Sequence, residues 1–224
     1  MELYEARDPR GLLGWPGELD IGELALICYP VWIHPCVTRM HLGARCVVGE
    51  RTALGSTTMT PLDGRTSIII GAGCVIGAGS VLRPGITVDP GALIPDGEVV
   101  NTSVAANEDM RREAERAREA IFAGLNDAEW FKLAVAEYRM MRWSGAADIY
   151  QRLNEKRERV EVLHNLALTL IAQGEAARGE RMLRRCLELY PAYRDAITNL
   201  RLLAQNQAPG LALEPTESFI RTFY

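Results

Sequence analysis

A six-residue repeat between Ile70 and Ser103 constrains the fold more than any other feature of the sequence. Every sixth residue of this stretch is a branched aliphatic residue, and the third residue after each of the first five is glycine. The aliphatic residues are Ile70, Ile76, Leu82, Val88, Ile94 and Val100, and the glycines are Gly73, Gly79, Gly85, Gly91 and Gly97. A period of six fits neither the 3.6-residue period of a helix nor a two-residue alternation, so it indicates a repeat architecture.

The repeat predicts short strands separated by turns, with three strands closing one coil of the chain. Glycine suits the turns, because a residue without a Cβ atom adopts a positive φ angle without a steric clash. The aliphatic residues then stack from coil to coil at strand spacing, roughly 4.7–4.9 Å, and form a continuous core. This pattern is typical of a left-handed parallel β-helix.

The repeat begins before Ile70 and is interrupted once. Three earlier hexads begin at Leu42, Val48 and Leu54 and make one full coil of eighteen residues. The interval from Leu54 to Ile70 is sixteen residues, which is not a multiple of six. The polar segment 60–67 falls in this interval. We expect it to leave the stack as a loop, and loops on rigid scaffolds often carry function.

The C-terminal half shows a second period of about 34 residues in helical patterns. Trp130, Leu133 and Ala134 recur as Leu163, Leu166 and Ala167, and then as Ile197 and Leu200. This spacing resembles the tetratricopeptide repeat, a helix–turn–helix unit in which small residues let the two helices approach closely. The resemblance implies two units over about 127–193 and a further helix from about Arg194 to Ala204.

Together the two periods predict an α+β protein of two domains, a left-handed parallel β-helix followed by a tetratricopeptide-like helical domain. We expect the β-helix, with an irregular N-terminal cap, over residues 1–106 and a linker helix over 107–124. The helical domain then covers 125–224. For its tail, Pro209–Tyr224, the sequence leaves open whether it caps the last helix or docks elsewhere.

The composition limits which kinds of partner and which cellular compartment we expect for this protein. The net charge is −4 and neither half is strongly basic, so we expect no nucleic-acid partner. Five unevenly spaced cysteines do not form a disulfide framework, and without clustered His and Cys residues we expect no metal. Cys46 and Cys74 fall on small inward positions of the hexads, where a thiol serves as a small hydrophobe. A charged N-terminus and no apolar run of transmembrane length predict a cytoplasmic protein without membrane contact.

The hexad block, over about residues 24–106, resembles the hexapeptide-repeat acyltransferase superfamily. That resemblance implies a homotrimer that binds acetyl-CoA or another acyl-CoA in clefts between neighbouring β-helices. It also implies a histidine that acts as general base on the hydroxyl or amine of the acceptor. We expect trimerisation also because outward residues of the hexads are apolar, namely Val47, Ala53, Val75, Val81 and Leu93.

The segment 57–62 is similar to the Thr-x-Thr-His-Pro-Leu loop of the sugar and maltose O-acetyltransferases in that superfamily. Here Thr60 occupies the position that matches their catalytic histidine, and a threonine hydroxyl cannot accept a proton near neutral pH as imidazole can. The closing Gly-x-Pro-Ala-Arg/Lys motif of those enzymes is also missing, with residues 101–106 in its place.

His41 is the substitute base that the spacing suggests, so the candidate catalytic residues are His41 and Thr60. The position one coil, or eighteen residues, after His41 is Met59, which is next to Thr60 in the sequence. The alternative is that His41 is an exposed or interface residue without a catalytic role. His34, in a less constrained stretch, is interpreted as structural.

Two functions remain open at this stage. The first is an acyl-CoA-dependent transferase with a helical domain that recruits an acceptor or a protein partner. This is the function that we prefer. The second is a catalytically inactive trimeric scaffold that uses its β-helix for assembly and its helical repeats for partner binding. In both, a protein or peptide partner is expected on the groove-facing sides of the first helices, at Phe131, Val135, His164, Leu168 and Asn199.

Overall fold

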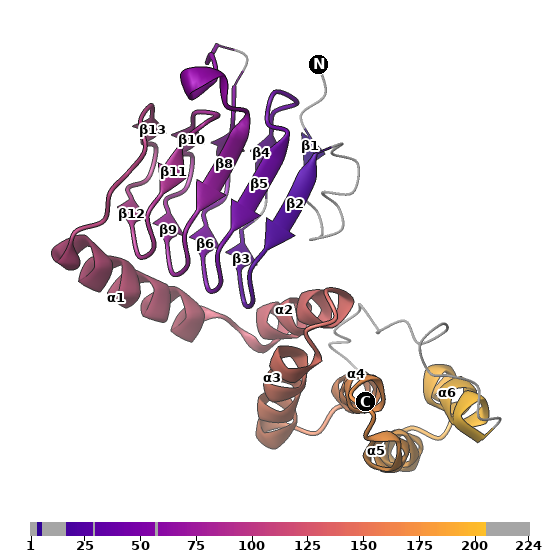
Figure 1. The fold of residues 1–224 in the computed structure, drawn as a ribbon. Coiled ribbons are helices and arrows are strands. Elements are labelled where there is room, and N and C mark those ends of the chain that lie inside the picture. Colours follow the sequence, from indigo (N-terminus) through magenta and orange to yellow (C-terminus); the bar gives the residue numbers. More distant parts are fainter. Residues whose placement is uncertain (1–3, 6–16, 29, 57, 205–224) are drawn as a thin grey trace. The chain divides into compact units, whose positions relative to one another are not determined.

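A computed structural model describes residues 4–5, 17–28, 30–56 and 58–204 of the chain (Figure 1). The chain divides into two compact units, Met1–Gly124 and Leu125–Tyr224. The first unit contains the strands and helix α1 (Glu108–Gly124), which covers most of the segment expected to be a linker. The tail Pro209–Tyr224, whose placement the sequence leaves open, lies outside the described residues.

The strands of the first unit are distributed in turn among three sheets. Sheet A has the order β1 (Tyr4–Glu5), β4 (Val31–Ile33), β7 (Thr52–Leu54), β10 (Val81–Leu82) and β13 (Val99–Val100). Sheet B has the order β2 (Glu18–Ile21), β5 (Arg39–Leu42), β8 (Ser67–Ile70) and β11 (Thr87–Val88). Sheet C has the order β3 (Leu26–Ile27), β6 (Val47–Val48), β9 (Val75–Ile76) and β12 (Leu93–Ile94). Three consecutive strands, one in each sheet, make one layer of a stack, and sheet B runs along it in Figure 1.

The fold class expected from the sequence, an α+β protein with a left-handed parallel β-helix before a helical domain, is wrong for this chain. In an α+β fold the helices lie against one face or end of an antiparallel sheet. Here four strands in each sheet pair in parallel, and β1 alone pairs antiparallel with its neighbour among the described strands. All six described α-helices follow the strands, and five of them form the C-terminal unit, while a short 3-10 helix, Leu62–Gly64, lies between β7 and β8. The parallel sheets are compatible with a β-helix. The six-residue period, however, predicts only the lengths of the strands and turns and does not predict the fold class of the whole chain.

The core of the stack is made by the aliphatic residues of the repeat, as the period predicts. Ile70, Ile76, Leu82 and Val88 are each fully buried. Because alternate residues of a strand point to opposite faces, the residue before each of them lies on the outside of its sheet.

The small residues of the hexads are hydrogen-bond donors between layers, and not only space fillers. The thiol of Cys46 donates to the carbonyl of Gly71 at 2.9 Å, and that of Cys74 donates to the carbonyl of Asp89 at 3.1 Å. Ser80 donates in the same way to the carbonyl of Pro95 at 2.9 Å. A hydrogen bond with Cys74 and burial both hold the pKa of the Cys46 thiol above its ordinary value, so this thiol keeps its proton.

The interruption of the repeat leaves the stack as a loop between β7 and β8, as expected. Leu54 pairs with Leu82, 28 positions later, whereas Leu82 pairs with Val100, 18 positions later. The additional residues of the longer interval lie between Gly55 and Thr66. The loop rests on the next layer, where Leu62 donates its N–H to the carbonyl of Pro84 at 2.8 Å.

Helix α1 covers the outer face of sheet C. It contacts β9 and β12, and the outward residues Val47 and Val75 are 2% and 6% exposed. The guanidinium of Arg118 donates to the carbonyl of Gly73 at 3.0 Å, and Arg45 lies over the ring of Phe122 at 5.7 Å. Val47 and Val75, expected to belong to an exposed apolar patch, are therefore covered within their own chain.

The outer faces of the other two sheets differ chemically from each other. The central outward row of sheet A is apolar and consists of Trp32, Ala53, Val81 and Val99, of which Val99 is 49% exposed. The corresponding row of sheet B consists of Asp20, His41, Ile69 and Thr87. The first unit thus has one covered face, one apolar face and one polar face.

The second unit contains the helices α2 (Asp127–Arg139), α3 (Trp143–Lys156), α4 (Val160–Ala172), α5 (Ala176–Leu189) and α6 (Arg194–Ala204). Helix α2 begins with a capping box, in which the Asn126 side chain accepts from the N–H of Glu129 and the Glu129 carboxylate accepts from the N–H of Asn126. A Cβ atom at Gly179 would lie 2.4 Å from Ile171 Cγ1, so glycine lets α4 and α5 approach closely. No helix in the described parts of the chain is long and apolar enough to cross a membrane.

Substitution of Gly91 by alanine tests how α1 is held on the stack. Gly91 has a φ of +74°, and a Cβ atom there would lie 2.9 Å from Arg111 Cγ on α1. Gly97 has a φ of +70°, and a Cβ atom there would meet nothing within 4 Å. Gly91→Ala and Gly97→Ala should each incur a backbone strain of about 1–2 kcal/mol. Gly91→Ala should lower the free energy of unfolding further, by about 1 kcal/mol, because it also displaces Arg111.

Hydrogen exchange of residues 108–124 separates the two effects. Exchange should increase in Gly91→Ala and stay near that of the unsubstituted chain in Gly97→Ala. Equal exchange in the two variants would show that this turn does not hold α1.

Candidate functional site

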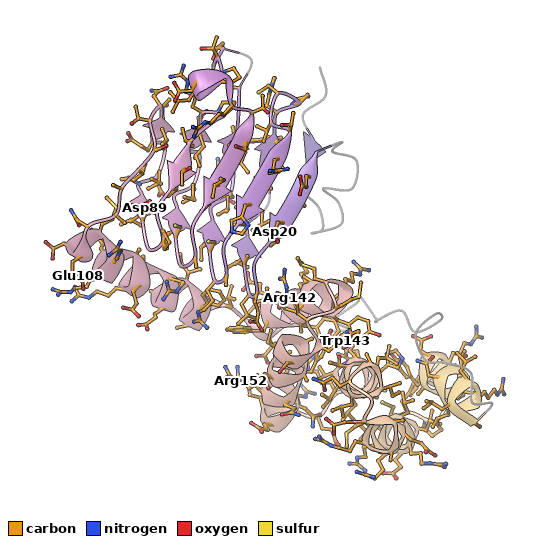
Figure 2. The ribbon with its side chains drawn as sticks, viewed as in Figure 1. Asp20, Asp89, Glu108, Arg142, Trp143 and Arg152 are labelled. Carbon is orange, nitrogen blue, oxygen red and sulfur yellow. The ribbon has the colours of Figure 1, made fainter. Side chains whose placement is uncertain are left out.

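The outer face of sheet B carries two pairs of polar side chains that join β2 to β5. Glu18 pairs with Arg39, whose Nε and Nη2 lie 2.8 and 2.7 Å from the carboxylate oxygen Oε2. Two residues further along both strands, Asp20 Oδ2 lies 2.7 Å from His41 Nδ1. Figure 2 labels Asp20 on β2. The strand register aligns both pairs, since Glu18 faces Arg39 and Asp20 faces His41 across the sheet.

The Asp20–His41 pair orients an imidazole for proton transfer. A carboxylate only accepts hydrogen bonds, so His41 donates Nδ1–H to Asp20 and, in the neutral ring, keeps a lone pair on Nε2. The side chains of His41 and Asp20 are 41% and 71% exposed, so a molecule in solution can reach the ring. An imidazole held by a carboxylate at one nitrogen and accessible at the other can act as a general base.

The surface next to His41 is partly apolar. Its neighbour on β8 is Ile69, which is 39% exposed, and the neighbour of Ile69 on β11 is the half-buried Thr87. Arg39 and Glu18 lie beside the pair on the same two strands. The row therefore offers an apolar contact on one side of the imidazole and a carboxylate on the other.

Thr60 lies in the loop and accepts hydrogen bonds from the side chain of Arg83. Arg83 donates from Nε to the Thr60 carbonyl at 2.7 Å and from Nη2 to its hydroxyl at 3.2 Å. Arg83 also donates to the carbonyl of Asn101 at 3.4 Å, which ties the loop to the layer below. The backbone neighbour of His41 on the next layer is Ile69 and not Met59, because the loop adds ten residues to that interval. The register thus brings His41 together with Asp20 rather than with the Thr60 segment.

His34 is buried and bonded to its own turn. Its Nδ1 accepts the N–H of Cys36 at 3.2 Å, and the residue is 8% exposed. These contacts agree with the structural interpretation of His34.

The five residues expected to bind a partner in the helical unit are all buried. They are Phe131 (0% exposed), Val135 (6%), His164 (0%), Leu168 (0%) and Asn199 (4%). Phe131 packs edge to face against Tyr150, with ring centroids 5.7 Å apart. His164 is hydrogen-bonded to Asn165 and Asn199. In this arrangement the five side chains belong to the core of the unit.

Within the described residues, no group of three or more His, Cys, Asp or Glu side chains is arranged to hold a metal ion.

Asp20 is the residue of the candidate site that the sequence did not lead us to expect. Its strand lies 21 positions before β5 rather than 18, outside the phase of the hexads. A signal was nevertheless present, since Glu18 and Asp20 have the same two-residue spacing as Arg39 and His41. Acidic residues on one strand and basic residues at the same spacing on another strand of alternating pattern indicate cross-strand pairs.

The chain was also compared with known proteins. No model of a known protein family matches the sequence, and no curated protein matches it. The resemblance drawn from the hexads therefore stays an expectation.

Substitution of Arg83 tests whether its hydrogen bonds hold the loop. Arg83→Ala removes two bonds to Thr60, each of which contributes about 1 kcal/mol. The loop should open more often, and limited trypsin digestion should then cleave after the exposed Arg65 up to roughly thirtyfold faster. The control is Arg51→Ala, which removes an exposed arginine that pairs with the adjacent Glu50. Similar cleavage rates after Arg65 in both variants would contradict this role of Arg83.

Proposed function

We propose that the chain is an acyl-CoA-dependent acyltransferase in which His41 is the general base and Asp20 positions it. The observation that carries the proposal is the 2.7 Å contact between His41 Nδ1 and Asp20 on an accessible strand face. The hexad resemblance supports acyl transfer as the reaction class. Acetyl-CoA or another acyl-CoA is the donor substrate, and a hydroxyl or an amine is the acceptor.

The proposed step begins with the acceptor bound beside His41 Nε2. The imidazole takes the proton of the acceptor O–H or N–H while the acceptor oxygen or nitrogen attacks the thioester carbonyl carbon. The carbon–sulfur bond then breaks, and the coenzyme A thiolate leaves and takes up the proton from the imidazolium. Asp20 stabilises the imidazolium through Nδ1–H and keeps the ring in the tautomer that the next turnover needs.

A purely structural role of the pair makes a different prediction from a catalytic one. Exposed ion pairs contribute about 0–1 kcal/mol to folding, so loss of Asp20 should change stability little. The neighbouring Glu18–Arg39 pair joins the same two strands and has no imidazole. It therefore serves as a matched control for any effect on the sheet itself.

The test measures acyl transfer and coenzyme A binding in parallel. His41→Ala should lower the rate of transfer by on the order of a hundred- to ten-thousand-fold, with coenzyme A binding retained in calorimetric titration. Asp20→Asn should give a smaller loss and change the pH profile of the rate. Glu18→Gln should leave both the rate and the profile unchanged. If His41→Ala retains full turnover, His41 is not the base.

We also propose that the chain forms a homotrimer through the apolar face of sheet A. Of the three outer faces, sheet C is covered by α1 and sheet B carries the polar pairs Glu18–Arg39 and Asp20–His41. The row of Trp32, Ala53, Val81 and Val99 is the apolar face that these observations leave for a second copy. Such an assembly would also form the clefts between copies in which the acyl donor is expected to bind.

Matched charge substitutions on two faces test the trimer. Val99 and Ile69 are both exposed aliphatic residues, on sheets A and B respectively. Light scattering should give a trimer for the unsubstituted chain and for Ile69→Glu, and a monomer for Val99→Glu. A monomeric unsubstituted chain at micromolar concentration would exclude the assembly and any site shared between copies.

The scaffold function is the second candidate, and the apolar face of sheet A also favours it. In this case the chain forms the trimer and binds a protein or peptide through its helical unit, but coenzyme A does not bind. Calorimetric titration with coenzyme A separates the two functions, since only the transferase requires a signal.

A further inference from the structure

Helix α4 is buried on every side. All twelve residues from Val160 to Ile171 are buried. Successive residues of a helix point about 100° apart, so twelve of them sample every direction around the axis. The sequence of α4 agrees with this burial, since Glu161 is its one charged residue. A helix that is apolar all round lies in the interior of its domain.

The neighbouring helices reach α4 through particular side chains. α5 packs closely against it at Gly179. α3 reaches Asn165, whose Nδ2 donates to the hydroxyl of Tyr150 at 3.2 Å. On α6, Asn199 Nδ2 lies 2.9 Å from His164 Nε2. One side of α4 therefore lies between the residue that reaches α6 and the residue that reaches α3.

This side of α4, between His164 and Asn165, carries Glu161 and Leu168. The two residues are seven positions apart, so they point within about 20° of each other, two turns along the helix. Glu161 is 2% exposed and Leu168 is 0% exposed. A carboxyl group and an aliphatic side chain are thus both removed from water on the same side, and such a side needs a cover.

Glu161 indicates what chemistry the cover has to supply. Within the described residues its Oε1 has no hydrogen-bond partner, and its ion-pair partner, Arg159 Nη1, is 3.8 Å away. Burial raises the pKa of this carboxyl group. A carboxyl oxygen accepts hydrogen bonds, so a cover that brings an N–H group to Oε1 removes the cost of leaving it unsatisfied. Together with Leu168, this favours a peptide segment with backbone N–H groups and apolar side chains.

The segment 205–224 directly follows α6 and lies outside the described residues. Its twenty residues span up to about 66–72 Å when extended. Packed helices are about 8–10 Å apart, so a segment that leaves α6 at Ala204 is long enough to cross α4. Pro209 and Pro215 disfavour a continued helix. Against three charged residues, the segment carries the apolar residues Leu211, Leu213, Phe219, Ile220, Phe223 and Tyr224.

We propose that the segment 205–224 covers the side of α4 that carries Glu161 and Leu168. The helical unit then holds its own chain on the face where a partner is expected. Tethering favours this occupant over a second copy, because a segment on a short linker reaches an effective concentration on the order of millimolar. A partner peptide of similar chemistry has to displace the segment before it binds. The proposal is independent of acyl transfer, since it concerns the second unit alone.

Photo-cross-linking in the full-length chain tests the occupant. Benzoylphenylalanine is placed at Leu213 or at Phe219, and the irradiated protein is digested with trypsin. At least one of the two positions should cross-link to the peptide 160–178, which trypsin releases from α4 and the following turn. The product should have the mass of one chain on a denaturing gel. The control position is Asp148, which is exposed on α3 and should give no cross-link to 160–178.

Two results of this experiment would overturn the proposal. Cross-links from both positions that avoid 160–178 would leave this side of α4 to another occupant. Products with the mass of two chains would show that a second copy supplies the segment.

Binding of a labelled synthetic peptide of residues 205–224 gives a second readout. In the full-length chain the peptide competes with the attached segment. Phe219→Ser/Phe223→Ser removes two aromatic side chains from the attached segment, and burial of each such side chain is worth about tenfold or more in binding. The peptide should therefore bind this variant at least tenfold more tightly than the unsubstituted chain. Equal affinities, or no binding to the variant, would contradict the proposal.

Two glutamate substitutions in the Phe219→Ser/Phe223→Ser chain locate the site. Glu161→Ala removes the buried acceptor and should weaken peptide binding by about tenfold. Glu180→Ala is the control, because Glu180 is a partly exposed carboxylate on α5 that pairs with Arg184, and it should leave peptide binding unchanged. An equal loss of affinity in the two variants would show that the segment does not bind at the Glu161 side of α4.

Discussion

Parallel pairing between successive layers is the constraint on which the first unit depends. It aligns the aliphatic residues into one core, and it also aligns the outward residues of each sheet into rows. Side chains take part in this pairing, since Cys46, Cys74 and Ser80 donate to carbonyls of the following layer. A donor at the small position thus gives a turn carbonyl of the following layer a hydrogen-bond partner. The same register places Asp20 beside His41, so the candidate site depends on the stack as much as the core does.

Much of the stack was predictable from the sequence, and the reasons for the failures are physical. The period of six places aliphatic residues inside and glycines in the turns, because both demands are local. The neighbour of His41 was not predictable, since an inserted loop of unknown phase separates it from β8. The covering of Val47 and Val75 by α1 depends on a helix more than 30 residues away, for which their own hexads carry no signal.

The helical unit shows a different limit of sequence reasoning. The 34-residue period places His164 and Asn199 on corresponding sides of the first helices, and these two side chains do come together across α4 and α6. The period does not predict how deeply these side chains are buried, because their burial depends on everything that packs against those helices. The residues expected to form an open groove are consequently found in the core. The fold class failed for a related reason, because local periods do not specify how strands and helices are grouped.

The loop between β7 and β8 has a consequence for how proteins of this kind can diversify. The registers of the strands before and after it are set by their own hydrogen bonds, and the intervals of 28 and 18 residues lead to the same pairing. Residues can therefore be added or removed at this corner without moving a strand from its place in the stack. Selection can change the length and composition of this one segment while the strand pairing of the remaining layers stays the same. The stack separates the part of the chain that must be conserved in spacing from the part that is free to vary.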